Sequence, residues 1–238
     1  KKWSDDLVMP VGNPDPSIDK VRDYLISLKG FNEFFGNLLI ERRANPTEDI
    51  ISDVATAEVN DEELNDAEML SMLQQFLVAG NETTTKLLTN LIHRLAVDSV
   101  LEDKLRSNPD LIDNFIEEGL RYEAPVGGLF RMAKEDTKVN DVEIKAGDHL
   151  WVIYAAANRD PEIFDNPDDF LVDRENAREH LAFGHGEHYC IGALLARKEA
   201  RIAIQLLLAN IKNLQLLEDK NKYEYEESFV LRGLKELH

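Results

Sequence analysis

The stretch FGHGEHYCIG, residues 183–192, decides how the rest of the chain is interpreted. It contains Cys190, the only cysteine in 238 residues, and it is rich in glycine. An acidic loop precedes it, and an apolar pattern of helical period follows over about residues 193–208. A thiol at such a helix start faces free N–H groups and the positive end of the helix dipole, which favour the thiolate. Because glycines let a backbone approach a flat or bulky group, the stretch indicates a ligand or a nucleophile.

Length, composition and charge restrict the class of protein. The chain is 43% hydrophobic and 31% charged, which is typical of one large or two small globular domains. Its formal net charge of −19 makes nucleic acid or an anionic lipid surface an unfavourable partner. One cysteine allows no internal disulfide, and no run reaches the ~18 apolar residues of a membrane span. We therefore expect a cytoplasmic protein that binds neither nucleic acid nor membranes.

Apolar periodicity predicts a mainly α-helical chain with a minor β part. Helices are expected over about residues 19–43, 49–57, 61–97, 99–106, 109–122 and 193–208. Short strands are expected over residues 130–132, 137–139, 142–144, 149–154, 214–217 and 229–231. Residues 1–16 are expected to form a loop, and Asn60 with Glu63 to cap the longest helix. Inside that helix, AGNETTT (residues 79–85) puts a glycine and polar side chains where burial should be greatest, and such a local conflict usually marks function.

The residues alone allow four interpretations of Cys190. A small buried hydrophobe is the default for this residue type. A zinc site could combine it with His185 and His188, although a tetrahedral site needs a fourth ligand. A nucleophile would need His188 as its base, but residues two apart rarely align for this. A haem-thiolate ligand needs one cysteine, a loop that lies flat on a porphyrin, and a donor for a propionate.

Phe183-x-x-Gly186-x-His188-x-Cys190-x-Gly192 resembles the haem-binding signature of the cytochrome P450 family, the haem-thiolate monooxygenases. Three further motifs follow the family's order and spacing. Residues 79–84 resemble the oxygen-activating segment of the central helix, and residues 118–121 resemble the Glu-x-x-Arg motif. Residues 157–161 and 170–174 resemble the stretch that leads into the cysteine loop. The resemblance runs from about Trp3 to His238 and is nearest to soluble prokaryotic members.

The resemblance implies a haem b cofactor with Cys190 as the axial ligand of its iron. Phe183 would shield the thiolate, and His188 and Arg131 would bind the propionates, although many relatives have arginine at the position of His188. Three glycines would give the cofactor and dioxygen room: Gly80, Gly186 and Gly192. His149 and His180 are expected to be surface residues.

Further roles follow from the same resemblance. Glu82 and Thr83 would deliver protons to dioxygen, because an alcohol beside an acid can relay them. Glu118, Arg121 and Arg174 would form a buried ionic triad that fixes the cysteine loop. The substrate pocket would be lined by mainly apolar residues, among them Phe76, Ala79, Val126, Leu129 and Val230.

The implied reaction inserts one oxygen atom of O₂ into a small apolar organic substrate. The chain lacks the Gly-x-Gly-x-x-Gly signature of nicotinamide or flavin binding, so electrons from NAD(P)H would arrive through a ferredoxin-like donor and its reductase. Arg197, Lys198 and Arg201 are expected to form the docking patch for that donor.

Family members carry a substantial portion before the part that matches this chain. Residues 1–238 would therefore be the C-terminal portion of one cytochrome P450 domain, with an N-terminally incomplete fold. The alternative is a non-catalytic, haem-free fragment that associates through exposed apolar surfaces.

Overall fold

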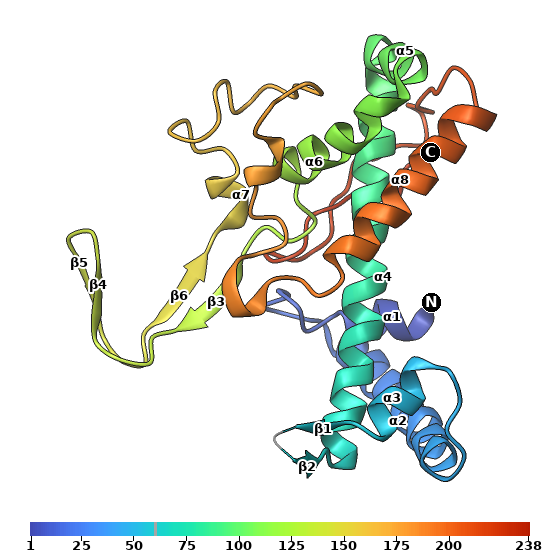
Figure 1. Ribbon diagram of the computed structural model, residues 1–238, viewed down its shortest axis with the longest axis vertical. Helices are drawn as coiled ribbons and strands as arrows, with labels where there is room; N and C mark the ends of the chain where they lie inside the picture. Colours follow the sequence, from blue (N-terminus) through green and yellow to red (C-terminus); the bar gives the residue numbers. More distant parts are fainter. Residues whose placement is uncertain (60) are drawn as a thin grey trace. The chain divides into compact units, whose positions relative to one another are not determined.

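The computed structural model describes residues 1–59 and 61–238, which form two compact units, residues 1–82 and 83–238 (Figure 1). The boundary falls inside one long helix, α4 (Asp66–Val97). Helices dominate both units, and the strands among the described residues form only two-stranded pairs. The predicted fold class, mainly α with a minor β part, is confirmed. Within these ranges no helix has both the length and the apolar character that crossing a membrane requires.

The first unit begins with a helix where a loop was expected. It contains α1 (Lys2–Leu7), α2 (Ile18–Ala44), α3 (Ile50–Ala55) and the small hairpin of β1 (Glu58–Val59) and β2 (Glu62–Glu63). The expected loop over residues 1–16 is therefore wrong for α1. The ring of Trp3 lies 5.7–6.3 Å from three phenylalanine rings of α2, which bury one face of α1: Phe31, Phe34 and Phe35. Tertiary burial of this kind stabilises a six-residue helix that is too short to be stable alone.

The start of α4 differs from the expected one. Asn60 lies outside the described residues, and Glu63 lies in β2 instead of the first helical turn. The helix begins at Asp66, where Asn65 accepts hydrogen bonds from the amides of Ala67 (3.0 Å) and Glu68 (3.1 Å). Glu68 in turn accepts from the Asn65 amide at 2.8 Å. This is a reciprocal capping box, five residues beyond the expected one.

The middle of α4 is helical without interruption. The glycine and the polar side chains of residues 79–85 suggest a local opening of the helix to make room for dioxygen, but this is wrong, because these residues keep their helical assignment. One glycine costs about 1 kcal/mol relative to alanine, which a long packed helix tolerates. A Cβ atom added at Gly80 would meet no atom within 4 Å, so the glycine leaves open space beside the helix.

Four helices build the core of the second unit: the C-terminal half of α4, α5 (Ser99–Ser107), α6 (Ile112–Tyr122) and α8 (Ala193–Asn210). A 3₁₀ turn, η1 (Pro109–Leu111), leads into α6. Their apolar faces meet in one buried cluster that includes Leu87, Leu91, Leu95, Phe115, Leu120, Ala200 and Ile204. Gly119 lets α6 approach α4 closely, because a Cβ atom there would collide with Leu91. The predicted helices are confirmed here because each has a regular apolar face.

The β part of the second unit consists of two antiparallel pairs. β3 (Leu129–Met132) pairs with β6 (His149–Val152), and β4 (Thr137–Val139) pairs with β5 (Val142–Ile144). The β4–β5 hairpin extends away from the helices of its unit (Figure 1), and Asn140 turns it with a φ of +52°. The remaining short elements are α7 (Tyr154–Ala157), η2 (Ala177–Glu179) and η3 (Gly186–His188).

The two strands expected near the C-terminus do not form. Residues 214–217 and 229–231 have no strand assignment, and this part of the chain contributes only two isolated bridges, Val126↔Leu231 and Tyr225↔Leu234. The first bridge holds the C-terminal segment beside residues 125–127, where the Gly127 amide donates to the Val230 carbonyl at 2.7 Å, and the second lies within that segment.

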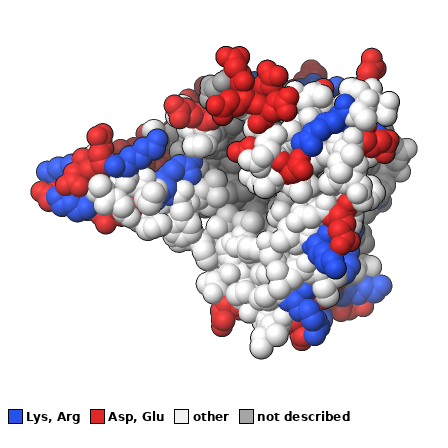
Figure 2. All heavy atoms as spheres, turned by 90° about the horizontal axis from the view of Figure 1, so that it is seen from below, with Lys and Arg blue, Asp and Glu red and all other residues white. Residues whose placement is uncertain are grey.

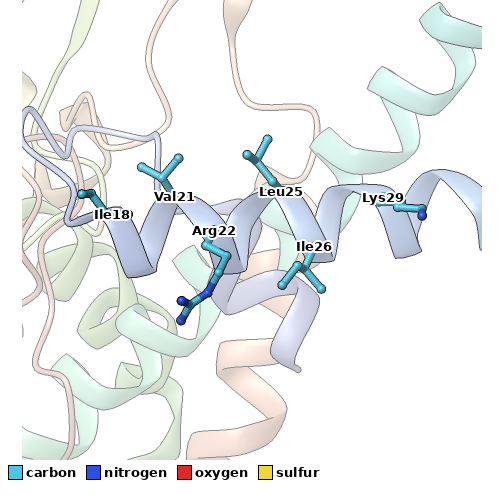
Figure 3. Close-up of a pocket in the computed structure, with 6 residues that line it drawn as sticks. All are labelled: Ile18, Val21, Arg22, Leu25, Ile26 and Lys29. Carbon is cyan, nitrogen blue, oxygen red and sulfur yellow. The ribbon is translucent and has the colours of Figure 1, made fainter.

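An open apolar groove runs along α2 in the first unit (Figure 3). It is lined by α2 alone, through Ile18, Val21, Arg22, Leu25, Ile26 and Lys29. In the view of Figure 3, Val21 and Leu25 project to one side of the helix, and Arg22 and Ile26 project to the other. The groove contains none of the residues expected to line a substrate pocket.

Candidate functional site

Cys190 lies at the end of an exposed loop whose backbone is tied to its own start. The Cys190 amide donates to the Phe183 carbonyl at 2.9 Å, and the Cys190 carbonyl accepts from Ala193, the first residue of α8, at 3.2 Å. The cysteine itself is exposed. The interpretation of Cys190 as a small buried hydrophobe is therefore wrong. The loop closes on Phe183 and presents the thiol at the start of a helix.

Glycines shape this loop in two ways. Gly184 (φ +71°) and Gly186 (φ +74°) adopt the left-handed conformation that other residues rarely take. A Cβ atom at Gly186 would meet no atom within 4 Å, and one at Gly192 would lie 3.8 Å from the Cys190 sulfur. The backbone around the thiol therefore has open space on one side and a small residue beside the sulfur.

Exposed apolar side chains flank Cys190 in the sequence. The exposed fraction is 91% for Ile191 and 82% for Leu194, and Leu195 and Tyr189 are also exposed. Exposed apolar groups gathered around one reactive side chain typically mark a binding surface.

Arg131 and the cysteine loop meet at a tyrosine that sequence reasoning missed. The guanidinium of half-buried Arg131 lies 3.5 Å from the hydroxyl of Tyr154. That hydroxyl is 3.6 Å from the Cβ position of Gly184. Tyr154 is buried and ends the stretch predicted as a strand over residues 149–154, so only its aromatic character could have marked it. The arrangement puts one cation beside the start of the cysteine loop.

The histidines of the loop do not form a metal site with Cys190. His185 directly precedes the η3 turn and His188 is its last residue, and both are exposed. Across residues 1–59 and 61–238, no three His, Cys, Asp or Glu side chains gather as a group that could hold a metal ion. The zinc interpretation through His185, His188 and Cys190 is therefore wrong for the described chain.

Glu118, Arg121 and Arg174 come together in a fully buried ion cluster. The Arg121 fork donates to both Glu118 oxygens, at 2.7 and 2.8 Å. The Arg174 Nε lies 3.1–3.2 Å from the same oxygens, and the Leu171 amide donates to Glu118 at 2.8 Å. The side chains of Glu118 and Arg121 are 0% exposed. Bidentate geometry and full hydrogen bonding are what a buried ion cluster needs to offset desolvation.

The remaining donors of the two arginines hold the irregular segment before the cysteine loop. Arg121 donates to three main-chain carbonyls, those of Asn158, Pro167 and Asp169, at 2.8–3.0 Å. Arg174 donates to the carbonyls of Asp165, Asn166 and Asp169 at 2.6–3.2 Å. Residues 158–174 contain no helix or strand, so these arginine bonds replace the ladder that regular structure would give.

The residues expected to move protons lie half-buried on α4, on either side of the boundary between the units. In the first unit, Glu82 accepts a hydrogen bond from the hydroxyl of buried Ser4 at 3.0 Å. Ser4 in turn accepts from the side-chain amide of Asn81 at 2.7 Å. Thr83 is half-buried at the start of the second unit. Ser4 was missed because the first residues were expected to form a loop.

The structure brings together only part of the expected substrate pocket. In the second unit, Val126 and Val230 lie on two segments that pair side by side, and Leu129 follows on β3. Leu129 is 38% exposed, whereas Val230 is buried. In the first unit, Phe76 and Ala79 are exposed on α4.

Glu117, next to Glu118 on α6, has a separate set of partners. Its carboxylate contacts His180 Nε2 at 3.0 Å and Arg197 Nε at 2.7 Å. Burial raises the pKa of the Glu117 carboxyl, but the bonds from His180 and Arg197 outweigh it and lower the pKa to about 2. His180 is 7% exposed, so the expectation that it is a surface residue is wrong: the carboxylate lets an imidazole be buried.

The basic patch expected on α8 is largely neutralised. Arg197 pairs with Glu117, and Arg201 pairs with Asp113 on α6. On the face drawn in Figure 2, most Lys and Arg side chains lie close to Asp or Glu side chains, while one group of acidic side chains has no basic side chain among it. Two of the three expected docking cations therefore stabilise contacts between α8 and α6.

Comparison with known proteins gives a consistent result. The family model described as "Cytochrome P450" matches residues 18–236. A "Cytochrome P450" of Bacillus subtilis is 41% identical over 87% of this chain and 50% of its own length. "Cytochrome P450 109" of Bacillus spizizenii is 39% identical over 100% of this chain and 59% of its own length. The chain thus spans about half to three fifths of these relatives.

Solved structures agree on the fold. P450BioI in complex with a hexadec-9Z-enoic acid-ligated acyl carrier protein has a TM-score of 0.89 and 36% identity. CYP109E1 from Bacillus megaterium in complex with corticosterone has a TM-score of 0.87 and 34% identity. Each match covers 99% of this chain, and 59% and 62% of the other chain, respectively.

Proposed function

Because the chain belongs to the cytochrome P450 family, we propose that it carries the haem-binding and oxygen-activating part of a haem-thiolate monooxygenase. The observation that carries this proposal is the sole cysteine, exposed at a helix start on a glycine-shaped loop. When bound, haem would supply the iron at which dioxygen is activated. The implied reaction inserts one oxygen atom into a small apolar organic substrate.

The residues of the cysteine loop fit a haem. Cys190 would hold the haem iron through its thiolate, with Phe183 beside it through the amide-to-carbonyl bond at 2.9 Å. The open space at Gly186, the small residue Gly192 and the exposed Ile191 and Leu194 suit an apolar macrocycle. Such a surface would exclude water from the thiolate side of the ligand.

Arg131 and His188 would hold the haem propionates. Arg131 lies half-buried beside Tyr154 at the start of the loop, where a carboxylate could replace its long contact of 3.5 Å with the phenol. His188 is exposed and would contribute less, because solvent screens an exposed pair.

Glu82 and Thr83 would move protons from the α4 side. Glu82 already ends a hydrogen-bond chain from Asn81 through Ser4, which gives its carboxylate a route to further donors. The open space at Gly80 would leave room for dioxygen. We expect Thr83→Ala to leave haem binding unchanged and to divert electrons to hydrogen peroxide; an unchanged product yield per electron would contradict this role.

Apolar residues would hold the substrate: Phe76, Ala79, Val126, Leu129 and Val230. Relatives are named for different ligands, a steroid and an acyl carrier protein among them, so the family alone does not select a substrate. Electrons from NAD(P)H would arrive through a ferredoxin-like donor and its reductase. Since Arg197 and Arg201 are paired, Lys198 is the remaining cation of the expected docking patch.

The test is the absorption spectrum of the reduced, carbon monoxide-bound chain after addition of haem. We expect the Soret band of a thiolate-ligated haem, and its loss in Cys190→Ala. The matched control is Glu187→Ala, which removes an exposed side chain of the same loop that has no proposed role and should keep the thiolate band. A thiolate band that survives in Cys190→Ala would overturn the assignment.

A second candidate is a haem-free, non-catalytic fragment. The exposed apolar side chains around Cys190 favour it, because without a ligand such a surface promotes association. Absence of haem uptake, together with concentration-dependent oligomers in sedimentation, would support this candidate over the monooxygenase.

A further inference from the structure

Glu117 is a buried carboxylate for which neither the family motif nor the proposed reaction has a use. Its side chain is only 2% exposed, although its partners Arg197 and Arg178 reach solvent. Its neighbour Glu118 belongs to the ion cluster with Arg121 and Arg174, so the two carboxylates of α6 serve different parts of the chain. A buried charge is stable only when well-placed charged or hydrogen-bonding partners offset its loss of hydration, so Glu117 and its partners fix one another's positions.

The partners of Glu117 lie on both sides of the cysteine loop. His180 precedes the loop, and Arg197 lies one turn into the helix that follows it. Arg197 donates to both carboxylate oxygens, at 2.7 and 3.0 Å, in a bidentate arrangement. One carboxylate therefore fixes the entry and the exit of the loop at the same time.

The state of His180 follows from its other nitrogen. The Ala182 amide donates to His180 Nδ1 at 3.1 Å, so Nδ1 is an acceptor and Nε2 carries the proton that is donated to Glu117. This bond fixes the ring, which lies 5.8 Å from the ring of Phe183. The start of the loop is thus held by one oriented imidazole.

Arg197 transmits the constraint to the residues around Cys190. Its guanidinium lies 4.5 Å from the centre of the Phe183 ring, and it donates to the Tyr189 hydroxyl at 3.3 Å. Phe183 is also the residue whose carbonyl accepts the Cys190 amide. Glu117, Arg197, Phe183 and Cys190 therefore form a continuous chain of contacts.

We propose that Glu117 is a positioning residue that sets the orientation of the thiol of Cys190 by holding both ends of its loop. The inference rests on the proposed function, because an oriented thiol matters when Cys190 is a metal ligand. Loss of the Glu117 charge releases the Arg197 guanidinium from its fixed position over Phe183. The Phe183 carbonyl then no longer keeps the Cys190 amide in one place.

The first test is hydrogen exchange in the full chain without haem. The exchange of the peptide over residues 181–192 is followed by mass spectrometry in the wild type and in Glu117→Gln. We expect exchange at the Cys190 amide to accelerate about tenfold or more, because its acceptor is no longer held. Arg197→Gln removes the partly exposed partner of Glu117 and should give the same local effect. This variant serves as the test if Glu117→Gln folds poorly.

The control is Glu179→Gln, which removes an exposed charge next to His180. It should leave exchange in the loop unchanged. Unchanged exchange in both Glu117→Gln and Arg197→Gln would overturn the proposal. Equal acceleration of hydrogen exchange throughout residues 83–238 would also overturn the proposal, because a residue that only stabilises the fold affects the whole unit.

The second test separates this proposal from the proposed function. In the haem-loaded protein, Glu117→Gln should increase the fraction of the reduced carbon monoxide complex that lacks the thiolate-type Soret band, whereas Glu179→Gln should not. An unchanged fraction would contradict the positioning role. If the wild type takes up no haem, the proposed function fails, and the exchange data still decide the role of Glu117.

Discussion

The ion cluster around Glu118 and the loop around Cys190 lie in the same unit but are built in opposite ways. In the cluster, the side chains of Glu118 and Arg121 have no exposed surface, and every donor of the Arg121 fork has a partner. In the loop, residues 185–191 are exposed and the backbone is held by few hydrogen bonds, chiefly that of Cys190 to Phe183.

The difference separates what this chain stabilises by itself from what it presents to a ligand. The cluster is satisfied within the chain, so changes there should lower the free energy of unfolding. The loop exposes apolar side chains and a thiol, so changes there should alter ligand binding more than stability. The variants below test how burial determines stability. Unfolding of the second unit is measured in a Trp3→Phe background, where Trp151 is the remaining tryptophan.

The largest effect is expected from Arg121→Ala. It leaves the Glu118 charge with only Arg174 and removes the donor to three carbonyls, so we expect a loss of about 3–5 kcal/mol in the free energy of unfolding. Urea unfolding followed by Trp151 fluorescence measures it. Arg201→Ala, which breaks a half-exposed pair with Asp113, is the control and should cost under about 1 kcal/mol. Equal losses of unfolding free energy in Arg121→Ala and Arg201→Ala would show that burial does not determine how much an ion pair stabilises this chain.

A smaller loss is expected from Gly119→Ala. The new methyl group collides with Leu91, a core residue that is 1% exposed, and overpacking of this kind costs about 1–3 kcal/mol. Gly36→Ala on α2 is the matched control, because its methyl group would meet no atom within 4 Å. Alanine is a better helix former than glycine. The midpoint of thermal unfolding, followed as the loss of helix content, should therefore rise slightly in Gly36→Ala. A neutral Gly119→Ala would show that α6 and α4 can separate without cost.

The pH dependence of stability should report on Glu117. Its pKa is lowered to about 2 in the folded chain from 4.5, so its stabilising contribution is present above about pH 4.5 and is lost as the pH falls towards 2. Since Arg197 is partly exposed and screened, we expect this contribution to be on the order of 1–2 kcal/mol. Glu117→Gln should flatten the fall in stability over this window, whereas Glu179→Gln should not. An unaltered profile in Glu117→Gln would contradict the lowered pKa.

The smallest effect is expected at the tip of the β4–β5 hairpin. Asp141 is fully exposed and its pair with Lys138 spans 3.4 Å, so Asp141→Asn should leave the denaturation midpoint within experimental error. A measurable loss of stability in Asp141→Asn would mean that exposed ion pairs also stabilise this chain. The difference between exposed pairs and the buried ion cluster would then be smaller than we expect.

Much of the fold could be predicted because regular apolar faces specify it. α2, α5, α6 and α8 begin and end within about three residues of the expected positions, and the β4–β5 hairpin turns where Asn140-Asp141 indicates. The cysteine loop was found because one cysteine stands among glycines, and the ion cluster because the residues around Glu118, Arg121 and Arg174 resemble motifs of the family.

The rest depends on contacts between residues distant in sequence. α1 exists because Trp3 packs on α2, and periodicity over six residues cannot show that. His180 and Arg197 looked like surface residues because their common partner, Glu117, lies 63 and 80 positions away, respectively. The C-terminal strands were expected from composition, but they lacked neighbours with which to form a sheet.

The arginine bonds to residues 158–174 also have a consequence for the order in which the chain folds. This segment has no helix or strand, and the carbonyls of Asn158, Asp165, Pro167 and Asp169 gain their arginine donors only after α6 presents Arg121 and Glu118 binds Arg174, 56 positions further along. Contacts between residues so far apart cost more loop-closure entropy than the local contacts of a helix. We therefore expect α6 to be formed in the folding transition state and the segment to order afterwards, with φ-values near zero at Arg174. The cysteine loop, which follows directly, would then take its final form in the last step of folding.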